Sequence, residues 1–279
     1  MPELPEVETV RRGLEREVVG RRIGRVEVNG ARSVRRQDPG SFVHELEGRR
    51  VDAARRRGKY LYAELDDGAA LVVHLRMSGQ LRLAGPPPLE PRSPHTHVVV
   101  GLGDGSELRF VDPRTFGELF VTSERSPDGL PSALAGLGAD PLVDGVDDAT
   151  LEELAACRRT ALKSLLLDQS VIAGVGNIYG DEVCFHSGLR PDRRTESLRG
   201  SDAARLGVAL RDVLTRAVEK GGSTLRDARY VGLRGAAGSY QHDHAVYGRA
   251  GRPCPRCGTL VERTRVGGRS AHFCPRCQR

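Results

Sequence analysis

Tryptophan is absent from this chain of 279 residues, and phenylalanine and tyrosine occur only six times each. Wide aromatic surfaces that stack the successive bases of a single strand are therefore not expected. The sequence also has no apolar run near the roughly 20 residues that cross a bilayer, and no hydrophobic signal segment opens it. These absences predict a soluble protein of the cytoplasm that has no membrane partner.

Acidic residues are outnumbered, because 43 Lys and Arg against 37 Asp and Glu give a net charge of +6. Arginine supplies most of the positive charge, and its planar guanidinium matches phosphate oxygens. The excess is concentrated in residues 248–279, where eight Arg face one acid, Glu262. This distribution favours a polyanionic partner, although ordinary enzymes also carry a net charge of this size.

Hydrophobic spacing divides the chain into a strand-rich and a helix-rich part. A helix is predicted over residues 5–19, and short alternating runs with Asp-Gly turns then predict an antiparallel β-sandwich, with strands at 25–28, 60–65, 71–75, 97–100 and 107–111. Helical periodicity follows at 149–157, 160–168, 181–186 and 201–220. The predicted fold class is α+β, with segments at 1–125, 126–147 (a Gly- and Pro-rich linker), 148–245 and 246–279. Residues 223–247 are predicted to be a long, mobile loop.

Four cysteines form two C-x-x-C pairs separated by sixteen residues: Cys254, Cys257, Cys274 and Cys277. Such pairs can close a tetrahedral site, and four thiolates leave no open coordination position. The pattern predicts one structural Zn²⁺, with a redox dithiol or an iron–sulfur site as the alternative. Cys157 and Cys184 stand alone within helical patterns and are predicted to be buried.

The N-terminal sequence Met1-Pro2-Glu3 indicates a possible nucleophilic amine beside a carboxylate. Removal of Met1 would leave Pro2 as a secondary amine, and an α-amino group titrates near about 8, so much of it is nucleophilic at neutral pH. Such an amine beside a carboxylate can form an iminium that stays cationic. The alternative is that Pro2 and Pro5 only stiffen the entry to the first helix.

Several other segments carry candidate phosphate or base contacts. Gly174 and Gly176 allow close approach of the backbone just before Asn177 at a helix start, and Arg269 lies in a Gly-rich tip between the cysteine pairs. For the segment from Gly174 to Asn177, the alternative is a helix–turn–helix cap that binds no ligand. Met77 and Phe116 each end a strand next to a cation; core packing is the simpler interpretation, and insertion into a base stack is the functional one.

Taken together, these motifs resemble the formamidopyrimidine-DNA glycosylase family from one end of the chain to the other. The resemblance rests on the opening residues 1–10, Gly58-Lys59-Tyr60, the loop 112–117, the segment 174–179, Tyr247-Gly248-Arg249 and the closing cysteine pairs. It implies a bifunctional enzyme of base-excision repair that acts on oxidised purines in duplex DNA and also nicks abasic sites. It also implies a catalytic β-sandwich domain, a helix–two-turn–helix DNA-binding domain and a zinc finger, acting as a monomer.

The resemblance also implies roles for single residues. Pro2 would attack the sugar C1′, Glu3 would be the acid/base partner, and Glu6 would support the lesion pocket. Four residues match positions that hold phosphates: Lys59, His74, Asn177 and Arg269. Of these, Lys59 is also predicted to be catalytic, with Pro2 and Glu3. Three match the group that fills the vacated base stack: Met77, Arg114 and Phe116. Lys163 matches a position linked to lesion recognition.

Two departures from the family pattern bear on the substrate. Arg76 stands where many members have a small residue, and the sequence Gly238-Ser239-Tyr240 differs from the expected Gly-Tyr-Phe. An endonuclease VIII-like enzyme for oxidised pyrimidines is therefore an alternative, although that branch usually has Gly where this chain has Leu4. A DNA-lesion binder without catalysis and a general zinc-ribbon nucleic-acid binder are further alternatives.

Overall fold

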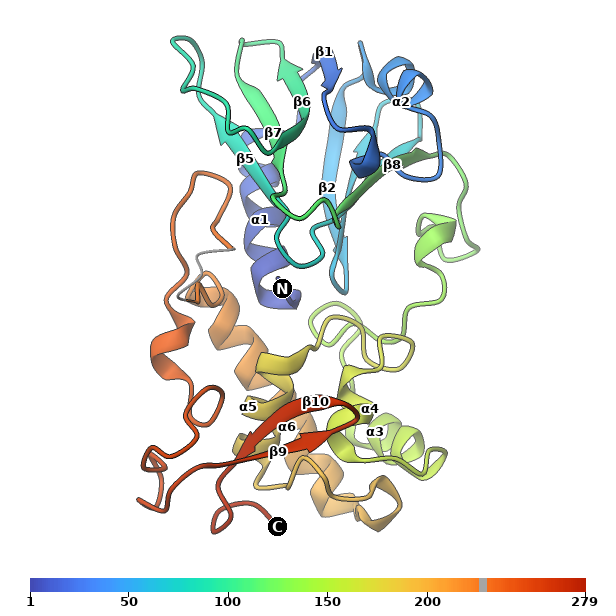
Figure 1. The fold of residues 1–279 in the computed structure, drawn as a ribbon. Coiled ribbons are helices and arrows are strands. Elements are labelled where there is room, and N and C mark those ends of the chain that lie inside the picture. The colour runs from blue at the N-terminus through green and yellow to red at the C-terminus, as the bar shows by residue number, and fades with distance from the viewer. Residues whose placement is uncertain (226–229) are drawn as a thin grey trace. The chain divides into compact units, whose positions relative to one another are not determined.

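The computed structural model describes residues 1–225 and 230–279 (Figure 1). The chain forms two compact units. The first contains residues 1–135 and 221–239, and the second contains residues 136–220 and 240–279. In the described parts of the chain, no helix combines the length and the apolar composition that crossing a membrane requires. The predicted functional boundaries after residues 125, 147 and 245 remain predictions.

The first unit is a sandwich of two four-stranded antiparallel sheets, as predicted. One sheet has the order β1-β6-β7-β5 and the other the order β2-β3-β4-β8. Two helices accompany them, α1 (Leu4–Glu17) and α2 (Pro39–Leu46). The strands are β1 (Ile23–Val28), β2 (Val51–Arg57), β3 (Tyr60–Leu65), β4 (Ala70–His74), β5 (Gln80–Ala84), β6 (Thr96–Leu102), β7 (Glu107–Val111) and β8 (Glu118–Thr122).

Four of these elements were not predicted from the sequence. The strands β2 and β5 lie between the predicted ones, β8 follows the last of them, and α2 lies in a region predicted to contain only strands. The charged run Arg55-Arg56-Arg57 lies before the predicted strand at 60–65 and also forms the end of a strand of its own, β2. The side chain of Arg55 is exposed and that of Arg56 is buried, which is the alternation of a strand. Because both residues are charged, this alternation does not appear as a hydrophobic pattern in the sequence.

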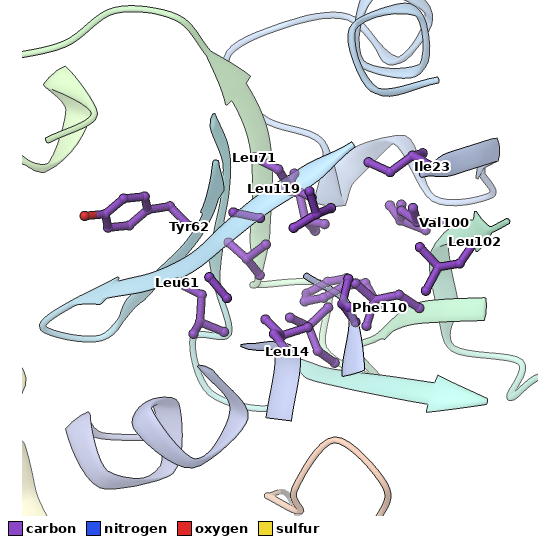
Figure 2. A pocket seen from close by; sticks show the side chains of 17 residues that line it. Leu14, Ile23, Leu61, Tyr62, Leu71, Val100, Leu102, Phe110 and Leu119 are labelled. Carbon is purple, nitrogen blue, oxygen red and sulfur yellow. The ribbon is translucent and has the colours of Figure 1, made fainter. Parts of the chain in front are cut away.

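The core of this unit lies between the two sheets and the apolar face of α1. Leu14 contributes from α1, Leu61 from β3 and Phe110 from β7 (Figure 2). These side chains surround an apolar cavity of about 30 Å³, which is the volume that about one water molecule occupies. The cavity is a packing defect of the sandwich core, and its lining carries no chemistry.

The segment 221–239 returns to the first unit after the helices of the second. Tyr230 and Leu233 are buried in the sandwich core, and Leu83 donates its backbone N–H to the Leu233 carbonyl at 2.9 Å. Leu233 packs against Gly13, where an added Cβ would lie 3.0 Å from the Leu233 Cβ. The predicted loop 223–247 therefore has firm attachments on its described part. Residues 226–229 of that loop lie outside the described residues.

The second unit contains the predicted helices and the cysteine-rich hairpin. Its elements are α3 (Asp148–Ala156), α4 (Leu162–Leu167), α5 (Asn177–Ser187), α6 (Gly200–Glu219), a short 3-10 helix (Tyr240–Asp243), β9 (Glu262–Val266) and β10 (Arg269–Phe273). All four predicted helices of this region are present. Cys184 is buried within α5 as predicted, but Cys157 is exposed because it caps the C-terminus of α3 rather than lying inside it.

Candidate active site and metal centre

The start of α1 gathers Pro2, Glu3 and Glu6, and all three are buried. The Glu3 N–H donates to Glu6 Oε2 at 2.8 Å, and the Glu3 side chain accepts a hydrogen bond from the backbone of Glu6. This reciprocal capping box fixes where the helix begins. Met1 still precedes Pro2, so the Pro2 nitrogen is an amide here and becomes an amine only when Met1 is removed.

Glu6 also connects this helix start to the returning segment. Its Oε1 accepts a hydrogen bond from the Ser223 N–H at 2.7 Å. The preceding residue, Gly222, has a φ of +77°, and a Cβ there would lie 2.7 Å from Glu6 Oε1. Glycine is therefore required at position 222 for both its backbone conformation and its close approach. One carboxylate thus holds two segments that are distant in the sequence.

His74, at the end of β4, is a buried neutral donor. Its Nδ1 accepts a hydrogen bond from the Arg76 N–H at 2.9 Å, which places the ring proton on Nε2. Burial, and then the charges of Arg76 and Lys59, lower the pKa of His74 to about 3. A phosphate at Nε2 would therefore receive a hydrogen bond from an uncharged imidazole. The Lys59 charge acts on His74 because the β2–β3 turn lies beside β4.

Met77, Arg114 and Phe116 project into solvent from the first unit. Met77 is 39% exposed and Phe116 is 47% exposed, so the core-packing interpretation of both residues is wrong. The Arg114 guanidinium carbon lies 4.8 Å from the centre of the Phe116 ring, in the range of a cation–π contact. Large apolar side chains held outside a well-packed sandwich are available to a partner.

A buried carboxylate, Asp112, organises the loop that carries Phe116, and sequence reasoning missed it. Asp112 Oδ2 accepts hydrogen bonds from the N–H groups of Phe116 and Gly117 at 2.8 and 2.7 Å. Its Oδ1 accepts from the Ser78 hydroxyl at 2.6 Å and from the Arg114 N–H at 3.1 Å. Asp112 therefore fixes the Phe116 loop and the Met77-Ser78 turn relative to each other. The Asp-Pro dipeptide was the available turn signal.

In the second unit, Asn177 and Arg269 come from distant segments to neighbouring positions. Asn177 is the first residue of α5, and its Nδ2 donates to the Ser270 Oγ at 3.4 Å. Exposed Arg269 opens β10 after Gly267 and Gly268, which both have positive φ. The positive end of a helix dipole, an amide, a hydroxyl and a guanidinium form a set of groups suited to phosphate.

Lys163 lies inside the second unit, with 1% of its side chain exposed. Its Nζ donates to Asp181 Oδ1 at 2.5 Å and to the Ser270 carbonyl at 2.6 Å. Asp181 Oδ2 in turn accepts the His272 N–H at 2.9 Å. These contacts join α4 and α5 to the hairpin strand β10. The role in DNA binding and lesion recognition expected for Lys163 remains a prediction.

The next residue of α5, Glu182, holds the chain as it enters the cysteine-rich segment. It accepts backbone N–H groups of Ala245, Val246 and Tyr247 at 2.8, 3.0 and 2.8 Å. Burial raises the pKa of Glu182, and these hydrogen bonds oppose the rise. Sequence reasoning missed Glu182, because its partners are backbone groups 63 to 65 residues away that leave no pattern in the sequence.

The four cysteines predicted to bind metal converge. All four Sγ atoms lie within 4.8 Å of one another, with Cys254 and Cys277 at 3.9 Å and Cys257 and Cys274 at 3.4 Å. Sulfurs at about 2.3 Å from a tetrahedral Zn²⁺ would be about 3.8 Å apart, so the donor set fits zinc. The site is closed by protein ligands and is structural rather than catalytic.

Family models match three successive parts of the chain. Residues 1–119 match the formamidopyrimidine-DNA glycosylase N-terminal domain, and residues 137–229 match the H2TH domain of the same enzymes. Residues 251–279 match a zinc finger found in FPG and IleRS.

Known proteins are similar over the whole length. The formamidopyrimidine-DNA glycosylase of Geobacillus kaustophilus is 46% identical over 280 residues, covering all of both chains. The crystal structure of the MutM (Fpg) protein from Thermus thermophilus has a TM-score of 0.86 at 45% identity, covering 99% of this chain and 98% of that one. The complex of Lactococcus lactis Fpg with DNA containing an abasic site has a TM-score of 0.89 at 36% identity, covering 99% of each chain.

Proposed function

Because the chain belongs to the formamidopyrimidine-DNA glycosylase family, we propose that Pro2 is the nucleophile with which it removes oxidised purines from duplex DNA. As a member of this family, the protein is a DNA glycosylase of base-excision repair that also has lyase activity at abasic sites. The observation that carries the proposed chemistry is the start of α1, where Pro2 adjoins two buried carboxylates, Glu3 and Glu6.

The proposed reaction begins once Met1 has been removed. The Pro2 nitrogen attacks the sugar C1′, the bond from C1′ to the damaged base breaks, and Glu3 manages the accompanying proton transfers. Opening of the sugar ring, with protonation of its oxygen, leaves an iminium between Pro2 and C1′. The positive charge acidifies the C2′ proton. Loss of this proton expels the 3′ phosphate and gives a conjugated iminium. Loss of the C4′ proton from that iminium then expels the 5′ phosphate.

The proposed DNA contacts come from both units. Lys59 and His74 hold phosphates near the extruded nucleotide, and Asn177 and Arg269 hold the backbone at the start of α5. Support comes from the donor character of His74 and from the Asn177–Ser270 contact. Exposed Met77 and Phe116, together with Arg114, fill the vacated stack, which offsets the few kcal/mol that base flipping costs. Glu6 is proposed to support the lesion pocket, and Lys163 is proposed to bind DNA at a position linked to lesion recognition.

The zinc ion fits the four cysteines and supplies folding energy to the hairpin that presents Arg269. No step of the reaction passes through it. The proposed functional segments are the catalytic domain 1–125, the linker 126–147, the DNA-binding domain 148–245 and the zinc finger 246–279. The proposed partner is double-stranded DNA that contains damaged bases or abasic sites. The relatives are bacterial, which supports a role in the bacterial cytoplasm. The protein is proposed to act as a monomer.

The variant Pro2→Gly tests the nucleophile. It should bind lesion duplexes as the wild type does but lose strand cleavage by on the order of a hundredfold, because the secondary amine that gives an obligately cationic iminium is gone. Cleavage assays on duplexes with 8-oxoguanine, formamidopyrimidine or oxidised pyrimidine also rank the substrates. Normal incision by Pro2→Gly would refute the assignment, and a preference for pyrimidines would favour the endonuclease VIII-like alternative.

A further inference from the structure

Arg56 joins the helix that carries the nucleophile to the turn that carries Lys59. Its side chain is 2% exposed, and its Nε lies 3.1 Å from Glu8 Oε2 on α1. Its Nη1 donates to the Gly58 carbonyl at 3.0 Å. A single guanidinium therefore contacts both elements at once. A lysine at this position has one nitrogen and lacks the fork needed to span the two acceptors in this way.

The contact with Gly58 fixes a turn that has two possible forms. Arg57 pairs with Tyr60 across β2 and β3, which leaves Gly58 and Lys59 as the two central residues. Gly58 has a φ of +56°, whereas Lys59 is not in the left-handed region, and this pattern defines a type II′ turn. Turning the central peptide over would give a type I′ turn, which needs a positive φ at Lys59. The hydrogen bond from Arg56 holds the Gly58 carbonyl and opposes that change.

The other end of the link is a charged anchor. Burial raises the pKa of Glu8, but hydrogen bonds and charge from Arg11, Arg56 and Arg12 outweigh it and leave the pKa below its ordinary value. Arg11 and Arg12 each donate to Glu8 at 3.0 Å. Glu8 is thus an ionised carboxylate that stays fixed on α1, just after the helix start.

We propose that Arg56 is a positioning residue that sets the orientation of Lys59 relative to the N-terminal amine. The inference rests on the proposed role of Lys59 in the reaction. The ammonium of Lys59 must meet a phosphate next to the sugar that Pro2 attacks, so a change of turn type would move it away from the reacting nucleotide. Misplacement of such a group by about 1 Å can cost up to a hundredfold in rate.

The scarcity of lysine makes this inference directly measurable. The chain contains three lysines, Lys59, Lys163 and Lys220. Protein labelled with ¹³C-lysine therefore gives three Cε resonances, which single Lys→Arg replacements assign. Arg55 provides a matched control, because it is on the same strand but is exposed and pairs with Glu64. The full zinc-loaded chain is used throughout, and its fold is followed by thermal unfolding and zinc content.

In Arg56→Gln, the Lys59 resonance should shift while those of Lys163 and Lys220 stay in place, and single-turnover cleavage of a lesion duplex should fall ten- to a hundredfold. Arg55→Gln should change neither. If Arg56→Gln does not fold, Arg56→Lys keeps a charge near Glu8 while giving up the contact with Gly58, and it should show the same two effects.

Each contrary outcome points to a different error. An unmoved Lys59 resonance in a folded Arg56 variant overturns the positioning role. A shifted resonance with an unchanged cleavage rate shows that Arg56 orients Lys59 without consequence for the reaction, which also overturns the inference. If Lys59→Met is then fully active as well, the failure lies in the proposed function of Lys59. The double variant Arg56→Gln/Lys59→Met is compared with Lys59→Met alone. If adding Arg56→Gln lowers the cleavage rate as much in the Lys59→Met protein as in the wild type, Arg56 does not act through Lys59, and the inference is overturned.

Discussion

His74 illustrates how burial decides what a single side chain can do. The imidazole is held neutral by its surroundings, so it can donate a hydrogen bond to a phosphate but adds no charge to the site. The electrostatic attraction for phosphates in the first unit must then come from lysine and arginine. His186 and His244, in the second unit, have pKa values that burial lowers to about 4, so these two histidines are held neutral in the same way as His74.

The depressed pKa of His74 predicts a loss of stability in acid. An unfolded histidine takes up a proton below about 6.5, whereas folded His74 stays neutral down to about 3, so the unfolded state binds more protons between these values. The free energy of unfolding should therefore fall as the pH is lowered from 6.5. Urea unfolding at pH 7.5 and 5.0 measures this free energy. In His74→Gln the free energy of unfolding should change less between the two pH values than in the wild type, whereas the control His95→Gln, at an exposed histidine, should behave like the wild type. Equal slopes in the wild type and His74→Gln would contradict the assignment.

At the scale of elements, the hairpin β9–β10 places its tip beside the start of α5. Arg269→Ala should weaken binding to duplexes of any sequence by a similar factor and lower the salt slope of log Kd by about 1, because one phosphate contact is lost. Binding titrations between 50 and 200 mM salt measure both. Arg194→Ala, at an exposed ion pair with Glu196, is the control. A loss confined to one base sequence would mean that Arg269 contacts a base.

The elements that sequence reasoning found are those with a one-sided apolar pattern. In α6, Leu206, Leu210 and Leu214 repeat on one face, and the helix is present as predicted. The strand β2 was not predicted because its last three residues are arginines, and the burial of Arg56 depends on its contact with Glu8 and not on hydrophobicity. Charge alone cannot reveal such a strand.

The residues of the candidate site also fall into a group that the sequence predicted and a group that it did not. Residues that would meet DNA directly lie in recognisable motifs and were predicted, whereas the residues that hold them were not. Asp112 and Glu182 bind backbone N–H groups, and Asp181 binds Lys163 and the backbone of His272. Backbone donors have no sequence signature, so only the folded chain identifies these carboxylates. The exposure of Phe116 likewise follows from the loop that Asp112 fixes and not from residue type.

At the scale of the whole molecule, the zinc site and the sandwich belong to different compact units. Chelation of zinc, or Cys254→Ala, should unfold the β9–β10 hairpin and reduce DNA affinity, while the β-sandwich keeps its structure. Zinc content, DNA binding and the circular dichroism of the sandwich measure these effects. Cys157→Ala, at an exposed cysteine, is the matched control. Unchanged affinity in a zinc-free protein would contradict a role for the hairpin in binding.

The proposed reaction depends on the identity of one nitrogen, that of Pro2. Incubation with a lesion duplex in the presence of borohydride should reduce the covalent intermediate to a stable adduct, and mass spectrometry of its peptides locates the bond. The predicted adduct lies on the N-terminal peptide, at Pro2, in a chain that has lost Met1. A reduced adduct on Lys59, Lys163 or Lys220, or full activity of a chain that retains Met1, would contradict the mechanism.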